Sequence, residues 1–137
     1  MGETKQLKDK IHVIKRSLIK DDRGWFLKAL TGKEDGLPDY TGEIYTTSAT
    51  PGQSKGGHYH EIANEWFTLL TGKAILKLKD IKTGEEMSVS LDSLDPVTVF
   101  VPPYVAHRFD NESDNDFILL AYTDLHYDPK DTIAYLL

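Results

Sequence analysis

The fold is decided in two stretches, residues 52–72, which read GQSKGGHYHEIANEWFTLLTG, and residues 96–111, which read PVTVFVPPYVAHRFDN. The first stretch holds His58 and His60 two positions apart. On a β-strand such residues point to the same face, about two rises of ~3.3 Å apart, so that two imidazoles can reach one metal ion. Glu65 opens the next apolar run, and an antiparallel return of the chain would bring His107 beside the first pair.

Three imidazoles and one carboxylate together make a candidate metal site, formed by His58, His60, Glu65 and His107. This donor set suits a divalent metal ion such as Zn, Fe, Ni, Co or Mn, and it does not by itself select one of them. The sequence has no cysteine. Disulfides, thiolate nucleophiles and cysteine-ligated zinc are therefore excluded.

Short apolar runs alternate with turn signals along the rest of the chain. Runs such as Glu43–Thr47, Met87–Leu91 and Val97–Val101 are typical of strands, whereas Pro51-Gly52 and Gly56-Gly57 indicate breakers around a short connection. About nine short strands at ~8–12-residue spacing predict an all-β sandwich or barrel.

We expect one domain over residues 1–137, with residues 1–10 as a frayed arm and residues 131–137 as a helical turn or a last strand.

The composition is that of an acidic globular domain. Hydrophobic residues make up 39% and charged residues 28% of 137 residues, and the formal net charge is −6. An acidic chain without a basic run is a poor candidate for binding nucleic acid or an anionic membrane. No run approaches the ~18 apolar residues of a membrane helix, and the N-terminus lacks a signal-peptide core, so we expect a cytoplasmic protein.

Fixed positions around the histidines carry a family resemblance. The spacing of Gly52, His58, His60, Glu65 and Gly72 matches the first motif of the cupin superfamily at every fixed position.

The second stretch resembles the second cupin motif through Pro102, His107 and Asn111, while Pro96 and Tyr104 stand where that motif has glycines. The resemblance implies the cupin double-stranded β-helix, a jelly-roll barrel.

Other segments narrow the resemblance to enzymes of sugar metabolism. Residues 22–26, DRGWF, resemble a segment of the dTDP-4-dehydrorhamnose 3,5-epimerases, and residues 55–58 lie where that family has R-G-x-H. Residues 43–135 also resemble the cupin domain of capsular-polysaccharide enzymes that act on UDP-linked keto sugars. They are similar as well to the nucleotide-sugar 3,4-ketoisomerases, which close on a run like residues 127–133. A segment like residues 101–108 also occurs in the archaeal cupin-type phosphoglucose isomerase.

These resemblances imply that the protein is an isomerase, either an epimerase or a ketoisomerase. Such an enzyme moves a proton next to the carbonyl of a nucleotide-linked keto-deoxy sugar in polysaccharide biosynthesis. His58 is the implied base and His60 the second candidate, unless both hold a metal that polarises the carbonyl. Tyr122 is the candidate acid, with Asp124 and His126 as weaker candidates.

A nucleotide sugar also needs cations for its pyrophosphate. Arg23 lies in the epimerases' substrate-binding segment, and Lys55 stands where that family has arginine. Arg108 either lies at the pocket rim or pairs with an acidic neighbour.

Two alternatives stay open, a non-catalytic metal-binding cupin that binds a small ligand or sugar, and a metal-dependent sugar-phosphate isomerase. We expect a homodimer, because a small sandwich must protect its strand edges, and these relatives pair edge strands through the N-terminal segment.

Overall fold

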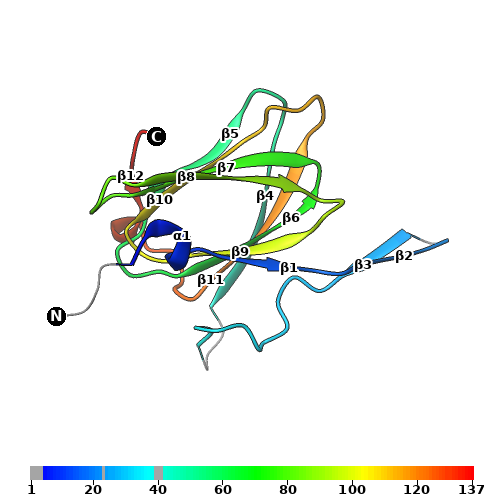
Figure 1. The fold of residues 1–137 in the computed structure, drawn as a ribbon, viewed down its shortest axis with the longest axis horizontal. Helices are drawn as coiled ribbons and strands as arrows, with labels where there is room; N and C mark the ends of the chain where they lie inside the picture. Colours follow the sequence, from blue (N-terminus) through cyan, green and yellow to red (C-terminus); the bar gives the residue numbers. More distant parts are fainter. Residues whose placement is uncertain (1–4, 23, 39–41) are drawn as a thin grey trace.

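The computed structural model describes residues 5–22, 24–38 and 42–137, with the side chains of all of these except residues 24–26. Strands dominate the chain, as the sequence predicts (Figure 1). The elements are α1 (Leu7–Lys10), β1 (His12–Lys15), β2 (Leu18–Asp21), β3 (Gly24–Leu27), β4 (Glu43–Ala49), β5 (Ser54–Tyr59), β6 (Glu65–Thr71), β7 (Lys73–Asp80), β8 (Glu86–Asp92), β9 (Val97–Val101), β10 (Val105–Asp110), β11 (Phe117–Thr123), the 3₁₀-helix η1 (Pro129–Asp131) and β12 (Ile133–Ala134).

Two antiparallel sheets of five strands form the body of the protein. Their strand orders are β1-β9-β6-β11-β4 and β12-β5-β10-β7-β8. From β4 to β7, and again from β8 to β12, consecutive strands lie in opposite sheets, which is the jelly-roll arrangement expected from the sequence. Strands β2 and β3 pair only with each other and extend away from this body in Figure 1.

The core lies between the two sheets and is built from alternating residues of their strands. In β7, for example, Ala74, Leu76 and Leu78 are buried, while the residues between them are more exposed. Phe67, from the facing sheet, lies with its ring centroid 4.9 Å from that of Phe109. The aromatic pair lies next to the histidines of the candidate site, because Phe67 also packs 5.3 Å from the ring of His107.

Two segments differ from the expectations drawn from the sequence, and a third follows one of the two alternatives expected for it. Residues 1–10 are not an arm throughout, because residues 7–10 form α1 and Leu7 is 1% exposed in the core. Residues 54–59 form strand β5 although they include two glycines. Of the two alternatives for residues 131–137, the structure forms the last strand, β12, while the 3₁₀-helix η1 precedes it and ends at Asp131.

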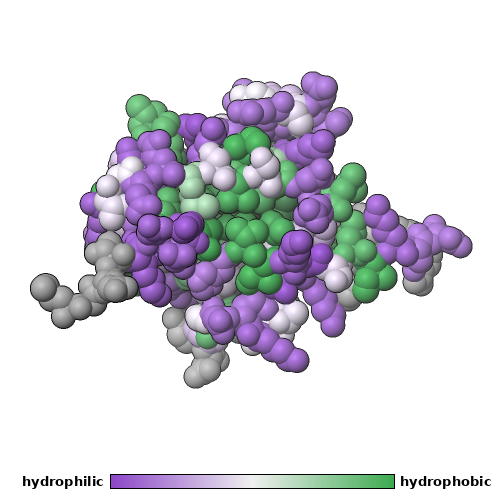
Figure 2. Space-filling model, in the orientation of Figure 1, coloured by the Kyte–Doolittle hydropathy of each residue, from purple (hydrophilic) through white to green (hydrophobic). Residues whose placement is uncertain are grey.

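The end strands of the two sheets leave part of the core near the surface. Strands β8 and β1 each pair with one neighbour, β7 and β9 respectively. Figure 2 shows apolar side chains in the middle of the face between these strands, surrounded by polar ones. None of the helices in the described ranges has both the length and the apolar character required to cross a membrane.

Candidate functional site

A β-bulge brings two of the predicted histidines together. His58 on β5 pairs with His107 on β10, but the next residue, Arg108, pairs with Gly56, so Gly57 is the extra residue of the bulge. Gly56 and Gly57 have φ angles of 97° and 81°, which residues with a Cβ rarely adopt. A Cβ on Gly56 would lie 2.8 Å from the carbonyl oxygen of His107, so glycine allows the two strands to approach closely.

The structure brings all four predicted ligands together. His60 follows β5, and Glu65 is the first residue of β6. One ligand atom from each of His58, His60, Glu65 and His107 lies within 4.8 Å of the others. The centroid of the His58 ring is 5.1 Å from that of His60 and 4.9 Å from that of His107. We call these four residues the histidine cluster.

Buried polar atoms converge in the cluster without hydrogen bonds. Glu65 Oε1 lies 2.7 Å from Nε2 of His60 and 3.3 Å from Nε2 of His107. Neither contact has hydrogen-bond geometry, and all three atoms are buried without a partner. Unpaired buried polar atoms are costly, and a cation between them would satisfy all three. Three imidazoles and one carboxylate therefore fit a divalent ion.

The other atoms of these side chains are held by hydrogen bonds. Nδ1 of His60 lies 2.8 Å from the carbonyl oxygen of Asp131, and Nδ1 of His107 lies 3.1 Å from that of Val105. A carbonyl oxygen can only accept, so each Nδ1 carries the proton when the ring is neutral, and each Nε2 then offers a lone pair. Both lone pairs belong to the atoms that converge on Glu65.

Burial and neighbouring charges shift the pKa values in opposite directions. Burial raises the pKa of Glu65, but the imidazoles of His107 and His60 outweigh burial and hold this pKa well below its usual range. Burial would lower the pKa of His60, but the Glu65 carboxylate raises it. Burial, followed by repulsion from the other two imidazoles, lowers the pKa of His58 to about 4.

Two cavities meet at the cluster. The acidic cavity, of about 290 Å³, is lined by the carboxylates of Glu43, Glu65, Asp128 and Asp131, with no lysine or arginine among the described residues of its wall. The lysine cavity, of about 320 Å³, is lined by Lys55 and by hydroxyl groups, with no carboxylate among its described lining residues. His58 lines both cavities.

Tyr45 is a site residue that no motif in the sequence marks. It lines both cavities, and its hydroxyl donates a hydrogen bond of 3.1 Å to Oε2 of Glu65. Burial and the nearby Glu65 charge raise the pKa of Tyr45 above its usual range, so the hydroxyl keeps its proton. The available signal is its place in β4, where it alternates with exposed Ile44 and Thr46.

Tyr122, the predicted acid, does not reach the cluster. Its ring packs 5.6 Å from that of Trp66, its hydroxyl accepts a hydrogen bond from the amide of Gly42 at 3.0 Å, and it lines neither cavity. The next residue, Thr123, lines the acidic cavity instead. Successive strand residues point to opposite faces, so a shift of one position removes Tyr122 from the site.

The two weaker acid candidates have different surroundings. His126 lines the acidic cavity. Asp124 accepts hydrogen bonds of 2.9 Å from both the backbone amide and the side-chain amide of Asn64, so it fixes the connection between β5 and β6.

The residues predicted to bind the pyrophosphate do not all lie at the cluster. Arg108 donates to both carboxylate oxygens of Asp110 at 2.6 and 3.0 Å and to the carbonyl oxygen of Leu137 at 2.8 Å. It lines neither cavity of the cluster, so the alternative of an ion pair with an acidic neighbour is the one observed. Lys55 lines the lysine cavity together with His58. Arg23 lies outside the described residues.

One residue that stands at a motif glycine supports the match to the second motif. Tyr104 has a φ of 63°, the left-handed conformation for which glycine is usual. Its amide donates a 2.7 Å hydrogen bond to the carbonyl oxygen of His60, so this turn lies against the cluster.

The chain resembles known proteins in sequence and in fold. The chain is 26% identical over 126 residues to the spore coat polysaccharide biosynthesis protein SpsL of Bacillus subtilis (strain 168), covering 88% of this chain and 83% of SpsL. A dTDP sugar isomerase from Desulfovibrio desulfuricans G20 has a similar structure, with a TM-score of 0.83, 19% identity, and coverage of 90% of this chain and 82% of that one.

The dTDP-6-deoxy-D-glucose-3,5-epimerase RmlC from Legionella pneumophila Philadelphia 1 also superposes, with a TM-score of 0.81 and 19% identity over 94% of this chain and 74% of that one. These two likenesses show that the fold is that of the RmlC-like cupins. The family model named Polysaccharide biosynthesis C-terminal domain matches residues 19–135. The chain belongs to this family.

Proposed function

We propose that the protein is an epimerase or ketoisomerase that moves a proton next to the carbonyl of a nucleotide-linked keto-deoxy sugar in polysaccharide biosynthesis. The observation that carries the proposal is the position of His58, whose ring borders both cavities of the site. No hydrogen bond joins its ring nitrogens to another described residue, so they are available to a substrate. The names of the similar proteins support the substrate class and the pathway.

His58 is suited to take the proton. A pKa lowered to about 4 keeps the imidazole neutral at pH 7, and a neutral imidazole has a lone pair for a substrate C–H next to a carbonyl. A sugar that spans both cavities would place its ring beside His58.

Tyr45 replaces Tyr122 as the proposed proton donor. Its hydroxyl remains protonated at neutral pH, and it lines the same two cavities as His58. Lys55 is the proposed partner of the pyrophosphate, because it lies in the cavity without carboxylates.

In the competing assignment, His58, His60, Glu65 and His107 would hold a divalent ion, and a group other than His58 would then take the proton. Such an ion, when bound, supplies Lewis-acid polarisation of the substrate carbonyl.

Solvent exchange tests the proposal. The protein is purified without added metal, its metal content is measured, and it is incubated in D₂O with dTDP- and UDP-linked 4-keto-6-deoxy sugars. Mass spectrometry should show deuterium in the recovered sugar. We expect His58→Ala to slow the exchange by ~10²–10⁴-fold, the usual range for a lost general base. His12→Ala is the control, because His12 lies on β1 outside the histidine cluster.

Each other outcome has a distinct meaning. Loss of both exchange and metal in His58→Ala would assign His58 as a ligand rather than the base. Deuterium in glucose 6-phosphate but in no nucleotide sugar would favour the sugar-phosphate isomerase. Deuterium in neither the nucleotide sugars nor glucose 6-phosphate would refute the proposal that the protein is an enzyme. It would favour a non-catalytic cupin that binds a sugar.

A further inference from the structure

We infer that Asp131 is the positioning residue of the site: its carboxylate caps the connection between β5 and β6, and this capping holds its own carbonyl against His60. The inference rests on the proposed function only in taking His60 and Glu65 as site residues. The site residues that Asp131 contacts are 68 to 71 positions away in the sequence, and its role is not visible from its place at the end of η1.

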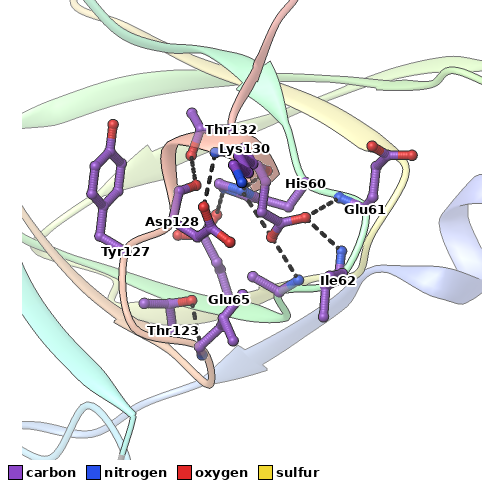
Figure 3. Close-up of polar contacts among 12 residues, drawn as sticks. His60, Glu61, Ile62, Glu65, Thr123, Tyr127, Asp128, Lys130 and Thr132 are labelled. Carbon is purple, nitrogen blue, oxygen red and sulfur yellow. Dashed lines mark hydrogen bonds and ion pairs between the residues drawn. The ribbon is translucent and has the colours of Figure 1, made fainter.

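The carboxylate of Asp131 accepts hydrogen bonds from three consecutive backbone amides. Oδ1 accepts hydrogen bonds of 2.9 Å from the amides of both Glu61 and Ile62, and Oδ2 accepts one of 3.1 Å from Ala63. Figure 3 shows dashed lines from the labelled Glu61 and Ile62 to one carboxylate. The residue is 4% exposed. A buried carboxylate with three charge-assisted hydrogen bonds is strongly held, and it holds the segment that donates to it.

The capped segment is the link between two cluster residues. Residues 61–63 directly follow His60, and only Asn64 separates them from Glu65. Their path therefore sets the distance between the side chains of His60 and Glu65. Asp131 therefore constrains both members of the 2.7 Å contact between His60 and Glu65.

The main chain of the same residue controls the ring of His60. The carbonyl oxygen of Asp131 lies 2.8 Å from Nδ1 of His60, and a carboxylate oxygen of Asp131 lies 3.7 Å from it. Both oxygens favour a proton on Nδ1, which leaves Nε2, the nitrogen beside Glu65, as the one that can offer a lone pair to a cation. A ring flipped or protonated on Nε2 would offer no lone pair there.

The surroundings keep Asp131 in place. Asp128 accepts a 2.9 Å hydrogen bond from the amide of Lys130 and so caps the start of η1. After η1, Ile133 and Ala134 pair with Tyr59 and His58 of β5. The carbonyl that meets His60 is thus fixed between a capped turn and a strand.

The chain contains a matched control in Asp124. This carboxylate also accepts a backbone hydrogen bond from the β5–β6 connection, from the amide of Asn64 at 2.9 Å, but it makes no contact with His60. A variant of Asp124 loosens the same connection without touching the imidazole.

The first readout is the tautomer of His60 in Zn²⁺-loaded protein, in which no proton is needed between Nε2 and Glu65. Long-range ¹H–¹⁵N spectra of ¹⁵N-histidine protein, at a pH where the ring is neutral, distinguish a proton on Nδ1 from one on Nε2; His60→Asn assigns the signal. We expect the Nδ1–H form in the wild type and in Asp124→Ala. Asp131→Ala should show a mixture. Asp131→Asn, which retains one acceptor oxygen, should lie between them and covers the case in which the alanine variant does not fold.

The second readout is the affinity for Co²⁺, followed by visible absorption. Loss of a group that orients a metal ligand usually weakens metal binding ~10–100-fold, and we expect this range for Asp131→Ala. Asp124→Ala should weaken it less than Asp131→Ala does, because the hydrogen bonds of residues 61–63 and the contact with the His60 ring remain.

A purely structural role would give a different pattern. Asp131→Ala and Asp124→Ala would then lower the melting temperature alike, with the His60 tautomer and the Co²⁺ affinity unchanged, and the inference would be refuted. An Nε2–H tautomer in the wild type would also refute it. Neither readout uses substrate, so failure of the proposed function leaves the outcome interpretable.

Discussion

Replacing Gly56 with alanine should separate the two strands that carry the histidines. The position has a φ of 97°, and the added Cβ would lie 2.8 Å from the carbonyl oxygen of His107 and 3.2 Å from Cα of Arg108. Both contacts are with backbone, which cannot rotate away as a flexible side chain would. Strand β5 must therefore move away from β10.

Gly84 isolates the contribution of the backbone angle. Its φ is 80°, and nothing lies within 4 Å of a Cβ added there. Gly84→Ala should lower the free energy of unfolding by about 1–2 kcal/mol, the cost of the left-handed conformation alone. Gly56→Ala carries the same cost together with about 1–3 kcal/mol of overpacking, so we expect a loss of about 2–5 kcal/mol.

Urea unfolding, monitored by tryptophan fluorescence, measures both losses, and a Co²⁺ titration measures the effect on the cluster. Gly56→Ala should weaken Co²⁺ binding, because it displaces His58 from His107, and Gly84→Ala should not. Equal losses of stability in the two variants, with equal Co²⁺ affinity, would show that the close approach of β5 to β10 does not maintain the cluster.

Three further predictions follow from other parts of the structure. Burial raises the pKa of Asp80, but Lys10 and backbone amides outweigh burial and lower this pKa in the folded protein. The ionised Asp80 therefore stabilises the fold above its ordinary pKa, and this stabilisation is lost as the pH falls through the lower pKa of the folded state. The urea midpoint should fall less between pH 6 and pH 3 in Asp80→Asn than in the wild type; parallel profiles would contradict this. Lys55→Ala should weaken binding of dTDP in calorimetry, whereas Arg108→Ala should lower the melting temperature and leave the Kd unchanged; the reverse result would return Arg108 to the site. Analytical ultracentrifugation should give the mass of a homodimer, because an isolated two-stranded sheet such as β2–β3 is marginally stable without a partner. The mass of a monomer would exclude the homodimer.

The regular strands could be predicted from sequence because their patterns are local. Residues 97–101 form β9 with the predicted bounds, and the alternation in residues 87–91 marks β8. Strand β5 could not be predicted, because Gly56 and Gly57 normally break strands and here create the bulge. The role of these glycines in the bulge depends on their pairing with β10, about 50 positions later, and no local sequence pattern shows that pairing.

The cluster residues could be predicted because fixed spacings carry them. Tyr45 and Asp131 could not, because each acts through a contact that only the folded chain creates, with Glu65 and His60 respectively. The assignment of Tyr122 depended on a register of one residue, which reverses the face of a strand. Such a detail needs the observed pairing of Tyr122 with Trp66.

The pairing of β12 with β5 has a consequence for the order in which the site can form during synthesis. Until residues 133–134 are available, β5 is the outer edge of its sheet, and the capping carboxylate of Asp131 is missing from the connection to β6. A nascent chain that already contains His58, His60 and His107 still presents an open strand edge, which is a surface for unwanted pairing. Completion of the site therefore coincides with protection of that edge, and both wait until residues 131–134 have been translated.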